Sequence, residues 1–206
     1  MSETLTGTAG DHPEFDDPPT DPIPLLRRWF DDAAENGVRE PMAASLATVR
    51  DGGPSSRFVA LKEVTDVGII FATSAESPKG QDILANPKVA FNLYWPETMQ
   101  QLRLVGRVEV LDDDEADRLF AARSRGARAT TIVSEQSEPL WSEDELVARA
   151  SELVASDDET PRPATQLGLH VVLDEVEFWL GDPDRLHRRL AYTKSESEWT
   201  SLRLQP

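Results

Sequence analysis

The sequence predicts a mainly β fold with flanking helices, and two patterns carry this prediction. Short segments rich in β-branched, aromatic and other apolar residues recur along the chain, with turn residues such as Asp51-Gly52-Gly53 between them. Other stretches repeat apolar residues at the spacing of an α-helix. The chain of 206 residues is long enough for one domain with a substantial core.

The expected elements have local signals at their ends. Asp21-Pro22 starts the first helix and Gly37 ends it, and its Trp29 and Phe30 are expected to pack in the core or at a dimer contact. A capping box at Ser142 starts the last helix. Residues 124–129 show no periodicity and are expected to form a loop. The expected helices cover residues 22–36, 77–86, 112–123 and 142–154, and the expected strands cover residues 43–49, 57–62, 68–73, 89–95, 101–110, 167–173, 175–179, 186–192 and 199–204.

Residues 1–20 are rich in Asp, Glu, Thr, Gly and Pro and have almost no apolar side chains. Because burial of such a segment cannot offset the entropy of ordering it, we expect a tail that is mobile or lies on a partner. A single domain over residues 21–206 follows it.

Composition excludes several classes of function. The 38 acidic and 21 basic residues give a net charge of -17, which argues against a nucleic-acid or anionic-membrane surface. The absence of Cys excludes disulfides and thiolate chemistry, and the three His residues predict no metal centre. Redox chemistry would therefore need an organic cofactor. No signal peptide pattern and no apolar run of about 20 residues is present, so we expect a cytoplasmic protein.

A polar cluster follows a hydrophobic strand near the C-terminus. Trp179 ends the strand, and after a turn Arg185, His187 and Arg189 alternate, which in an extended chain places their side chains on one face. Guanidinium groups beside an aromatic wall suit a planar anionic ligand. An exposed edge strand with solvated charges accounts for the same pattern.

A second group of basic residues lies in the strand Arg57-Phe58-Val59-Ala60-Leu61-Lys62. A regular strand turns Arg57 and Lys62 to opposite faces, separated by five steps of about 3.3 Å. These two cations therefore do not share one small anion. A long ligand with phosphate at one end and a ring at the other can use both.

The run from Glu177-Phe178-Trp179 to Arg185-Leu186-His187 and Arg189 resembles the C-terminal signature of the pyridoxamine 5'-phosphate oxidase family of FMN-dependent oxidases. The resemblance extends over residues 22–206 and is closest to the phenazine-biosynthesis flavin oxidases. It implies a homodimeric FMN-binding split β-barrel with two sites at the dimer interface.

The resemblance also implies where FMN binds. Arg57 and Lys79 would meet its phosphate, Lys62 its ring and the substrate, and Gln101 the ring; Pro78 stands where the family has an Arg. Gln136, Trp179 and Arg189 would come from the opposite chain. The implied FMN contacts are Arg57, Phe58, Val59, Ala60, Leu61, Lys62, Ala72, Thr73, Ser77, Lys79, Gln101, Gln136, Ser137, Trp179 and Arg189.

For the substrate, the resemblance implies contacts with Lys62, Arg123, Arg185 and His187, of which Arg185 and His187 are the expected catalytic residues. Vitamin-pathway members hold a substrate phosphate with Tyr, Arg and Ser, and this chain has Leu119, Arg123 and Ala127 there. Since two hydroxyl donors are missing, we expect a carboxylated, partly reduced phenazine precursor, with dioxygen as the acceptor. The alternatives are a pyridoxamine or pyridoxine 5'-phosphate oxidase and a non-catalytic flavin- or haem-binding protein.

Overall fold

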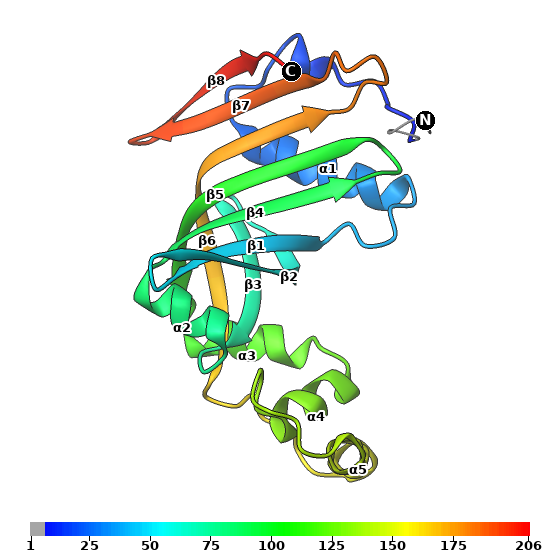
Figure 1. The fold of residues 1–206 in the computed structure, drawn as a ribbon, viewed down its shortest axis with the longest axis vertical. Helices are drawn as coiled ribbons and strands as arrows, with labels where there is room; N and C mark the ends of the chain where they lie inside the picture. Colours follow the sequence, from blue (N-terminus) through cyan, green and yellow to red (C-terminus); the bar gives the residue numbers. More distant parts are fainter. Residues whose placement is uncertain (1–6) are drawn as a thin grey trace.

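The computed structural model describes residues 7–206, which form one antiparallel eight-stranded sheet with helices around it (Figure 1). The strand order is β3-β2-β1-β4-β5-β6-β7-β8, and pairing of β3 with β6 closes six strands into a barrel. The expected mainly β fold with flanking helices is confirmed. The strands are β1 (Ala43–Arg50), β2 (Gly53–Val64), β3 (Gly68–Ser74), β4 (Lys88–Trp95), β5 (Gln100–Val110), β6 (Gln166–Leu180), β7 (Arg188–Ser195) and β8 (Glu198–Leu204).

Strand β6 is one continuous element where two strands were expected. Leu173 pairs with Gly106 and Glu175 pairs with Val105, so Asp174 is an extra residue between two paired positions. Such a bulge bends a strand without ending it. Strand β6 can therefore pair with β3 near its start and with β7 near its end.

The helices are α1 (Pro22–Glu35), α2 (Pro78–Ala85), α3 (Asp113–Ala121), α4 (Arg125–Val133) and α5 (Glu143–Ala155). The loop expected at residues 124–129 is wrong, because α4 begins there. Ser124 caps this helix by accepting a hydrogen bond from the amide of Ala127, and Arg125 donates to carbonyls at the end of α5, including that of Leu153. None of the helices in residues 7–206 has the length and apolar character needed to span a bilayer.

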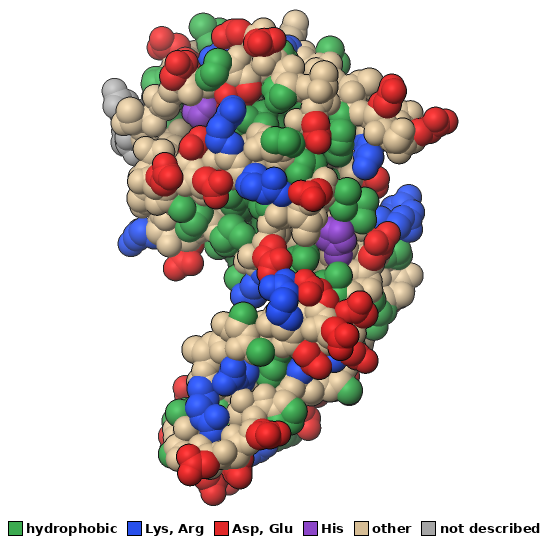
Figure 2. Space-filling view, turned by 180° about the vertical axis from the view of Figure 1, so that it is seen from behind, with side chains coloured by type: hydrophobic (Ala, Val, Ile, Leu, Met, Phe, Trp, Pro, Cys, Tyr) green, Lys and Arg blue, Asp and Glu red, His purple; other side chains and the backbone are tan. Residues whose placement is uncertain are grey.

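The molecule is elongated, and its two ends differ in structure. Strands β7 and β8 and the C-terminus lie at one end, and α3, α4 and α5 lie at the other (Figure 1). Seen from behind, the helical end narrows to a lobe, and the surface is hollowed where this lobe meets the barrel (Figure 2). Helix α1 packs on the barrel through Trp29 and Phe30, whose rings contact Phe178 and Trp95 at centroid distances of 4.9 and 5.4 Å. The core position expected for these two rings is confirmed.

The segment before α1 packs on the domain, so the tail expected up to residue 20 is wrong for its described part. A short 3-10 helix, η1 (Pro13–Phe15), buries Phe15 in the main core. Glu14 accepts hydrogen bonds from the Trp29 indole and Arg28, and the Tyr192 hydroxyl donates to the carbonyl of Pro19. The polar composition of this segment did not reveal that Phe15 is buried in the core or that the buried Glu14 carboxylate has its own hydrogen-bond donors. Residues 1–6 lie outside the described part of the chain.

Replacing Phe15 with Ala is expected to lower the free energy of unfolding by about 3–5 kcal/mol, because a 1 % exposed ring leaves a cavity. Chemical denaturation at one fixed protein concentration measures this loss. Asp17→Ala, an exposed change in the same segment, should alter stability by less than about 0.5 kcal/mol. Equal small losses for both variants would mean that residues 13–20 contribute nothing to the packed domain.

Candidate functional site

A cavity of about 410 Å³ lies between strands β2 and β3 and the helical lobe. The wall combines apolar side chains of α3, such as Leu119 and Phe120, with basic side chains at three places: Lys62 on β2, Lys79 at the start of α2 and Arg123 after α3. The exposed Glu76 also lines it. Among the residues predicted to bind FMN or substrate, those in the lining are Phe58, Val59, Ala60, Lys62, Ala72, Thr73, Lys79, Arg123 and Gln136.

The start of α2 forms a polar corner of this cavity. Ser77 caps the helix by accepting from the amide of Gly80, and its hydroxyl also receives a bond of 3.3 Å from Nζ of Lys79. Thr73 lies 3.3 Å from the same hydroxyl. Burial, reinforced by nearby Arg57, lowers the pKa of the Lys79 ammonium. A lysine in such surroundings gains by binding an anion.

Gln136 belongs to this corner in the same chain. Its Oε1 accepts hydrogen bonds of 3.4 Å from both the Thr73 hydroxyl and the Ser74 amide. Gln136 thus lies beside the Lys79 corner of its own chain, whereas the resemblance implied a contribution from the opposite chain. Helix α4, which was not expected, carries the chain back to β3 and brings Gln136 there. Ser137 is exposed, has a positive φ of 74° and does not line the cavity.

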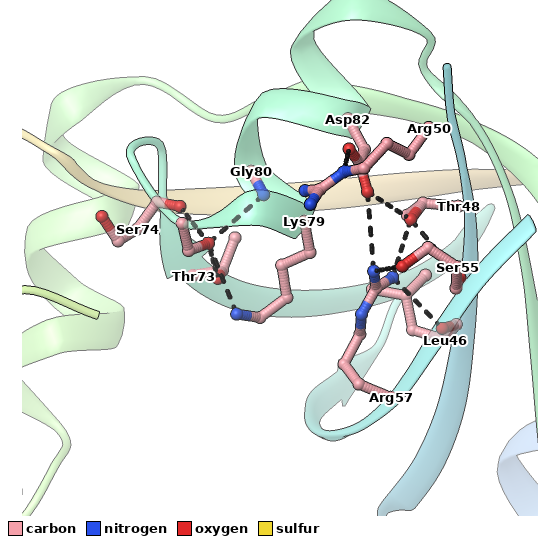
Figure 3. Close-up of polar contacts among 11 residues, drawn as sticks. Leu46, Thr48, Arg50, Ser55, Arg57, Thr73, Ser74, Lys79, Gly80 and Asp82 are labelled. Carbon is pink, nitrogen blue, oxygen red and sulfur yellow. Dashed lines mark hydrogen bonds and ion pairs between the residues drawn. The ribbon is translucent and has the colours of Figure 1, made fainter. Parts of the chain in front are cut away.

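Arg57 lies on the other face of β2 from Lys62, as the alternation of the strand predicted, and it is not part of the cavity lining. Its guanidinium donates to the hydroxyls of Thr48 and Ser55, each at 2.7 Å, and lies 3.5 Å from the Asp82 carboxylate (Figure 3). Burial lowers the pKa of Arg57, and Asp82 opposes this shift.

The charges around Asp82 do not balance. Arg50 contacts this carboxylate at 2.8 Å and Arg57 lies 3.5 Å from it, and a third cation, Lys79, lies close enough to Arg57 for its pKa to be lowered. A phosphate monoester carries about -1.5 to -2 charges near neutral pH, which matches the excess. The residues present therefore fit the phosphate of FMN.

Leu61 is buried in β2 and does not line the cavity, and the remaining predicted residues lie at the far end of β6. Gln101 pairs with Trp179, and Trp179 pairs with Arg189. Arg189 donates to Glu177 at 2.7 Å, and Glu177 also receives Arg103 at 3.1 Å. Burial alone would raise the pKa of Glu177, but these two guanidinium groups hold it below its usual value. Arg189 is thus fixed as a cation beside Trp179.

Arg185 and His187 do not alternate with Arg189 on one strand, so that expectation is wrong. The loop continues to residue 187, and β7 begins at Arg188. The Asp182 amide donates to Nδ1 of His187, and Arg185 takes a left-handed φ of 66° as its amide bonds the carbonyl of Asp182. The His187 ring nevertheless packs against Trp179 at a centroid distance of 4.7 Å, with the two planes tilted by 39°.

Within one chain, strand β6 separates the residues that line the cavity from the group around Trp179, which comprises Gln101, His187 and Arg189. Leu167 lines the cavity near the start of the strand, and Trp179 stands twelve positions later, roughly 40 Å along the curved strand at about 3.3 Å per residue. Figure 1 shows the two ends of β6 at opposite sides of the barrel.

Sequence reasoning missed the residues that surround Arg57, namely Thr48, Arg50, Ser55 and Asp82. Two weak signals were present. Thr48 continues the inward-facing series of Leu46 in β1, and Asp82 stands one helical turn after Lys79. Neither signal reveals that both side chains meet Arg57, because that contact depends on how α2 packs on β1.

Comparison with known proteins agrees with this geometry. The family model of pyridoxamine 5'-phosphate oxidase matches residues 30–157, and that of the pyridoxine 5'-phosphate oxidase C-terminal dimerisation region matches residues 167–206. The chain is 41% identical over 206 residues to dihydrophenazinedicarboxylate synthase of Burkholderia lata, which covers 99% of this chain and 97% of that protein. It is 43% identical over 189 residues to the pyridoxine/pyridoxamine 5'-phosphate oxidase of Cupriavidus pinatubonensis, covering 90% and 89%.

Among solved structures, the crystal structure of PhzG from Burkholderia lata in complex with tetrahydrophenazine-1-carboxylic acid superposes with a TM-score of 0.93. The two chains are 40% identical, and the match covers 98% of this chain and 100% of that one. The dimerisation-region match supports the expected homodimer. The chain belongs to the pyridoxamine 5'-phosphate oxidase family and is an FMN-dependent oxidoreductase with the split-barrel fold.

Proposed function

We propose that the protein oxidises a partly reduced, carboxylated phenazine precursor, with dioxygen as the final electron acceptor. The observation that carries the proposal is the environment of Arg123. Its guanidinium lies 5.5 Å from the centroid of the Phe120 ring, beside Leu119, and burial lowers its pKa. A half-buried cation on an apolar wall suits a flat ring that bears a carboxylate. The match with the Burkholderia lata synthase over nearly its full length supports the same substrate class.

The same wall disfavours a substrate phosphate. Thr130 and Thr131 line the cavity, but their hydroxyls donate to the carbonyls of Gly126 and Ala127. The Ser134 hydroxyl donates to the carbonyl of Thr130. These hydroxyls would have to break existing bonds to donate to a phosphate, and Leu119 offers none. The second candidate is a pyridoxamine 5'-phosphate oxidase, and these three hydroxyl groups are not free to hold the phosphate of its substrate.

FMN, when bound, supplies a two-electron acceptor that dioxygen reoxidises to give hydrogen peroxide. The protein binds FMN and the substrate and orients them for the reaction. Lys79, Arg57 and Thr73 would hold the phosphate end, while Lys62, Gln101, Trp179 and Arg189 would hold the ring. Lys62 and Arg123 would anchor substrate carboxylates, together with Arg185 and His187 from the other end of β6.

The loop geometry gives His187 a defined role in this proposal. Because its Nδ1 accepts the Asp182 amide, the neutral ring carries its proton on Nε2. His187 then donates a hydrogen bond to the substrate and has no free nitrogen to act as a base. Oxidation that restores aromaticity does not require a positioned base, so orientation by His187 suffices.

A complete site needs two chains, because β6 holds its two groups of residues apart. The outer face of β1, β2 and β4 offers the contact surface for a second copy. Phe58 is 76% exposed and Tyr94 47%, and both line a second groove on this face. Phe58 lines the cavity as well, so a partner docked here would meet the edge of the proposed FMN site.

Under air, the purified protein is expected to consume a reduced phenazine carboxylate and release hydrogen peroxide, and to form little pyridoxal phosphate from pyridoxamine phosphate. Replacing Arg123 with Met should lower kcat/KM for the carboxylated substrate about 10- to 100-fold, the worth of a charge-assisted hydrogen bond. FMN affinity should stay unchanged. Efficient pyridoxal phosphate formation by the wild-type protein would instead establish the second candidate.

Mixing two impaired variants tests the shared site, at an FMN concentration too low to fill either variant alone. Lys79→Met removes a cation of the cavity, and Arg189→Met removes a cation beside Trp179. When equal amounts of the two chains are refolded together, about half of the dimers contain one chain of each kind. Each mixed dimer keeps one unaltered site, so activity should return to about a quarter of the wild-type value. No recovery in verified mixed dimers would mean that Lys79 and Arg189 of one chain serve the same site.

FMN affinity is expected to fall with rising pH as Lys79 loses its proton. Its pKa lies below that of an ordinary lysine, 10.5, and only the charged form attracts phosphate, so the loss begins at a lower pH than for an exposed lysine. Lys79→Gln should bind FMN about tenfold more weakly at neutral pH and lack this pH dependence. Flavin fluorescence measures the affinity and its pH dependence for the wild type and for Lys79→Gln. Any protonation change of FMN itself affects the two proteins alike. Parallel pH profiles would exclude Lys79 from the phosphate site.

A further inference from the structure

A buried carboxylate lies behind the proposed phosphate site. Asp82 is on α2, one turn after Lys79, and its side chain is 4% exposed. Its Oδ2 accepts from the Thr48 hydroxyl at 2.8 Å, and its Oδ1 accepts from Nε of Arg50 at 2.8 Å. Figure 3 shows Asp82, Arg50 and Thr48 converging on one side of Arg57.

The hydroxyl of Thr48 connects Asp82 to Arg57. It has a single proton, which it donates to Asp82, so its lone pairs face the NH1 group of Arg57 at 2.7 Å. The ionised carboxylate therefore fixes the hydroxyl as an acceptor for the guanidinium. Burial alone would raise the pKa of Asp82, but the bonds from Arg50 and Thr48 hold it below its usual value, so the carboxylate remains ionised.

Arg50 shares the charge of Asp82. It contacts the carboxylate at 2.8 Å, whereas the nearest nitrogen of Arg57 lies 3.5 Å away. Asp82 and Thr48 thus orient the Arg57 guanidinium, while Asp82 forms its closest ion pair with Arg50. Arg57 also lies close enough to Lys79 to lower the pKa of that lysine.

We propose that Asp82 is a positioning residue, which acts through Thr48 to hold the Arg57 guanidinium in place for the phosphate of FMN. The proposal rests on the proposed function only for the location of the phosphate beside Arg57 and Lys79. It does not depend on which substrate is oxidised.

The test exploits two effects of opposite sign. Replacing Asp82 with Asn removes a negative charge near the phosphate, so Coulomb attraction alone predicts tighter FMN binding. Loss of positioning predicts weaker binding, about tenfold, the size expected when a partner that orients a binding side chain is removed. Titration of the apoprotein with FMN, followed by flavin fluorescence, measures the dissociation constant. Asp31→Asn makes the same charge change on the exposed face of α1 and should leave FMN binding unaltered.

Two further comparisons separate positioning from a general loss of structure. Thr48→Val removes the connecting hydroxyl and should weaken FMN binding, while Thr48→Ser keeps it and should restore the affinity. In an Arg57→Lys background no guanidinium remains to be oriented, so Asp82→Asn should change the affinity by about twofold at most. If Asp82→Asn does not fold, the Thr48 pair decides the question alone.

The outcomes distinguish this proposal from the proposed function. Wild-type protein that binds FMN while Asp82→Asn binds it equally well or more tightly would overturn the role of Asp82 and leave the oxidase function intact. An Asp82→Asn defect of the same size in the Arg57→Lys background would also overturn it. Wild-type protein that binds FMN but oxidises no reduced phenazine carboxylate would refute the proposed function, and the FMN titrations would still decide the role of Asp82.

Discussion

The continuity of β6 is the constraint on which the rest of the structure depends. Near its start the strand pairs with β3 and closes the barrel, and near its end it pairs with β7 and presents Trp179. A bulge at Asp174 lets one strand serve both purposes. The same continuity keeps the cavity and the Trp179 cluster apart in one chain. Any ligand that uses both must bind between two copies, and the dimerisation region at residues 167–206 includes this strand.

Buried carboxylates set the positions of the cations that we propose bind the ligand. The chain is strongly acidic, with a net charge of -17, yet basic side chains line the cavity and gather behind it. Asp82 holds Arg50 and stands beside Arg57, and Glu177 holds Arg103 and Arg189. Since a guanidinium fixed by a carboxylate loses less freedom on binding an anion, this arrangement prepares both groups for a ligand. Glu177 is also the first residue of the signature that pointed to the family.

The sequence was sufficient to predict the structure where a local pattern is compatible with a single conformation. Alternation in β2 placed Arg57 and Lys62 on opposite faces, and Ser77 could be predicted to start α2. It was insufficient where tertiary contacts decide the structure. Helix α4 is stabilised by α5, which receives Arg125, and Phe15 is anchored by a core that the local composition does not reveal. The left-handed Arg185 and the His187 bond to the Asp182 amide are loop contacts that an alternating pattern cannot predict.

The visible absorption spectrum of the purified protein, with mass analysis of any chromophore released on denaturation, tests the FMN site most directly. We expect flavin bands, FMN as the released molecule and about one FMN per chain, since a two-fold dimer repeats the site twice. A colourless protein that also fails to take up added FMN would contradict the cofactor site on which the proposed reaction depends.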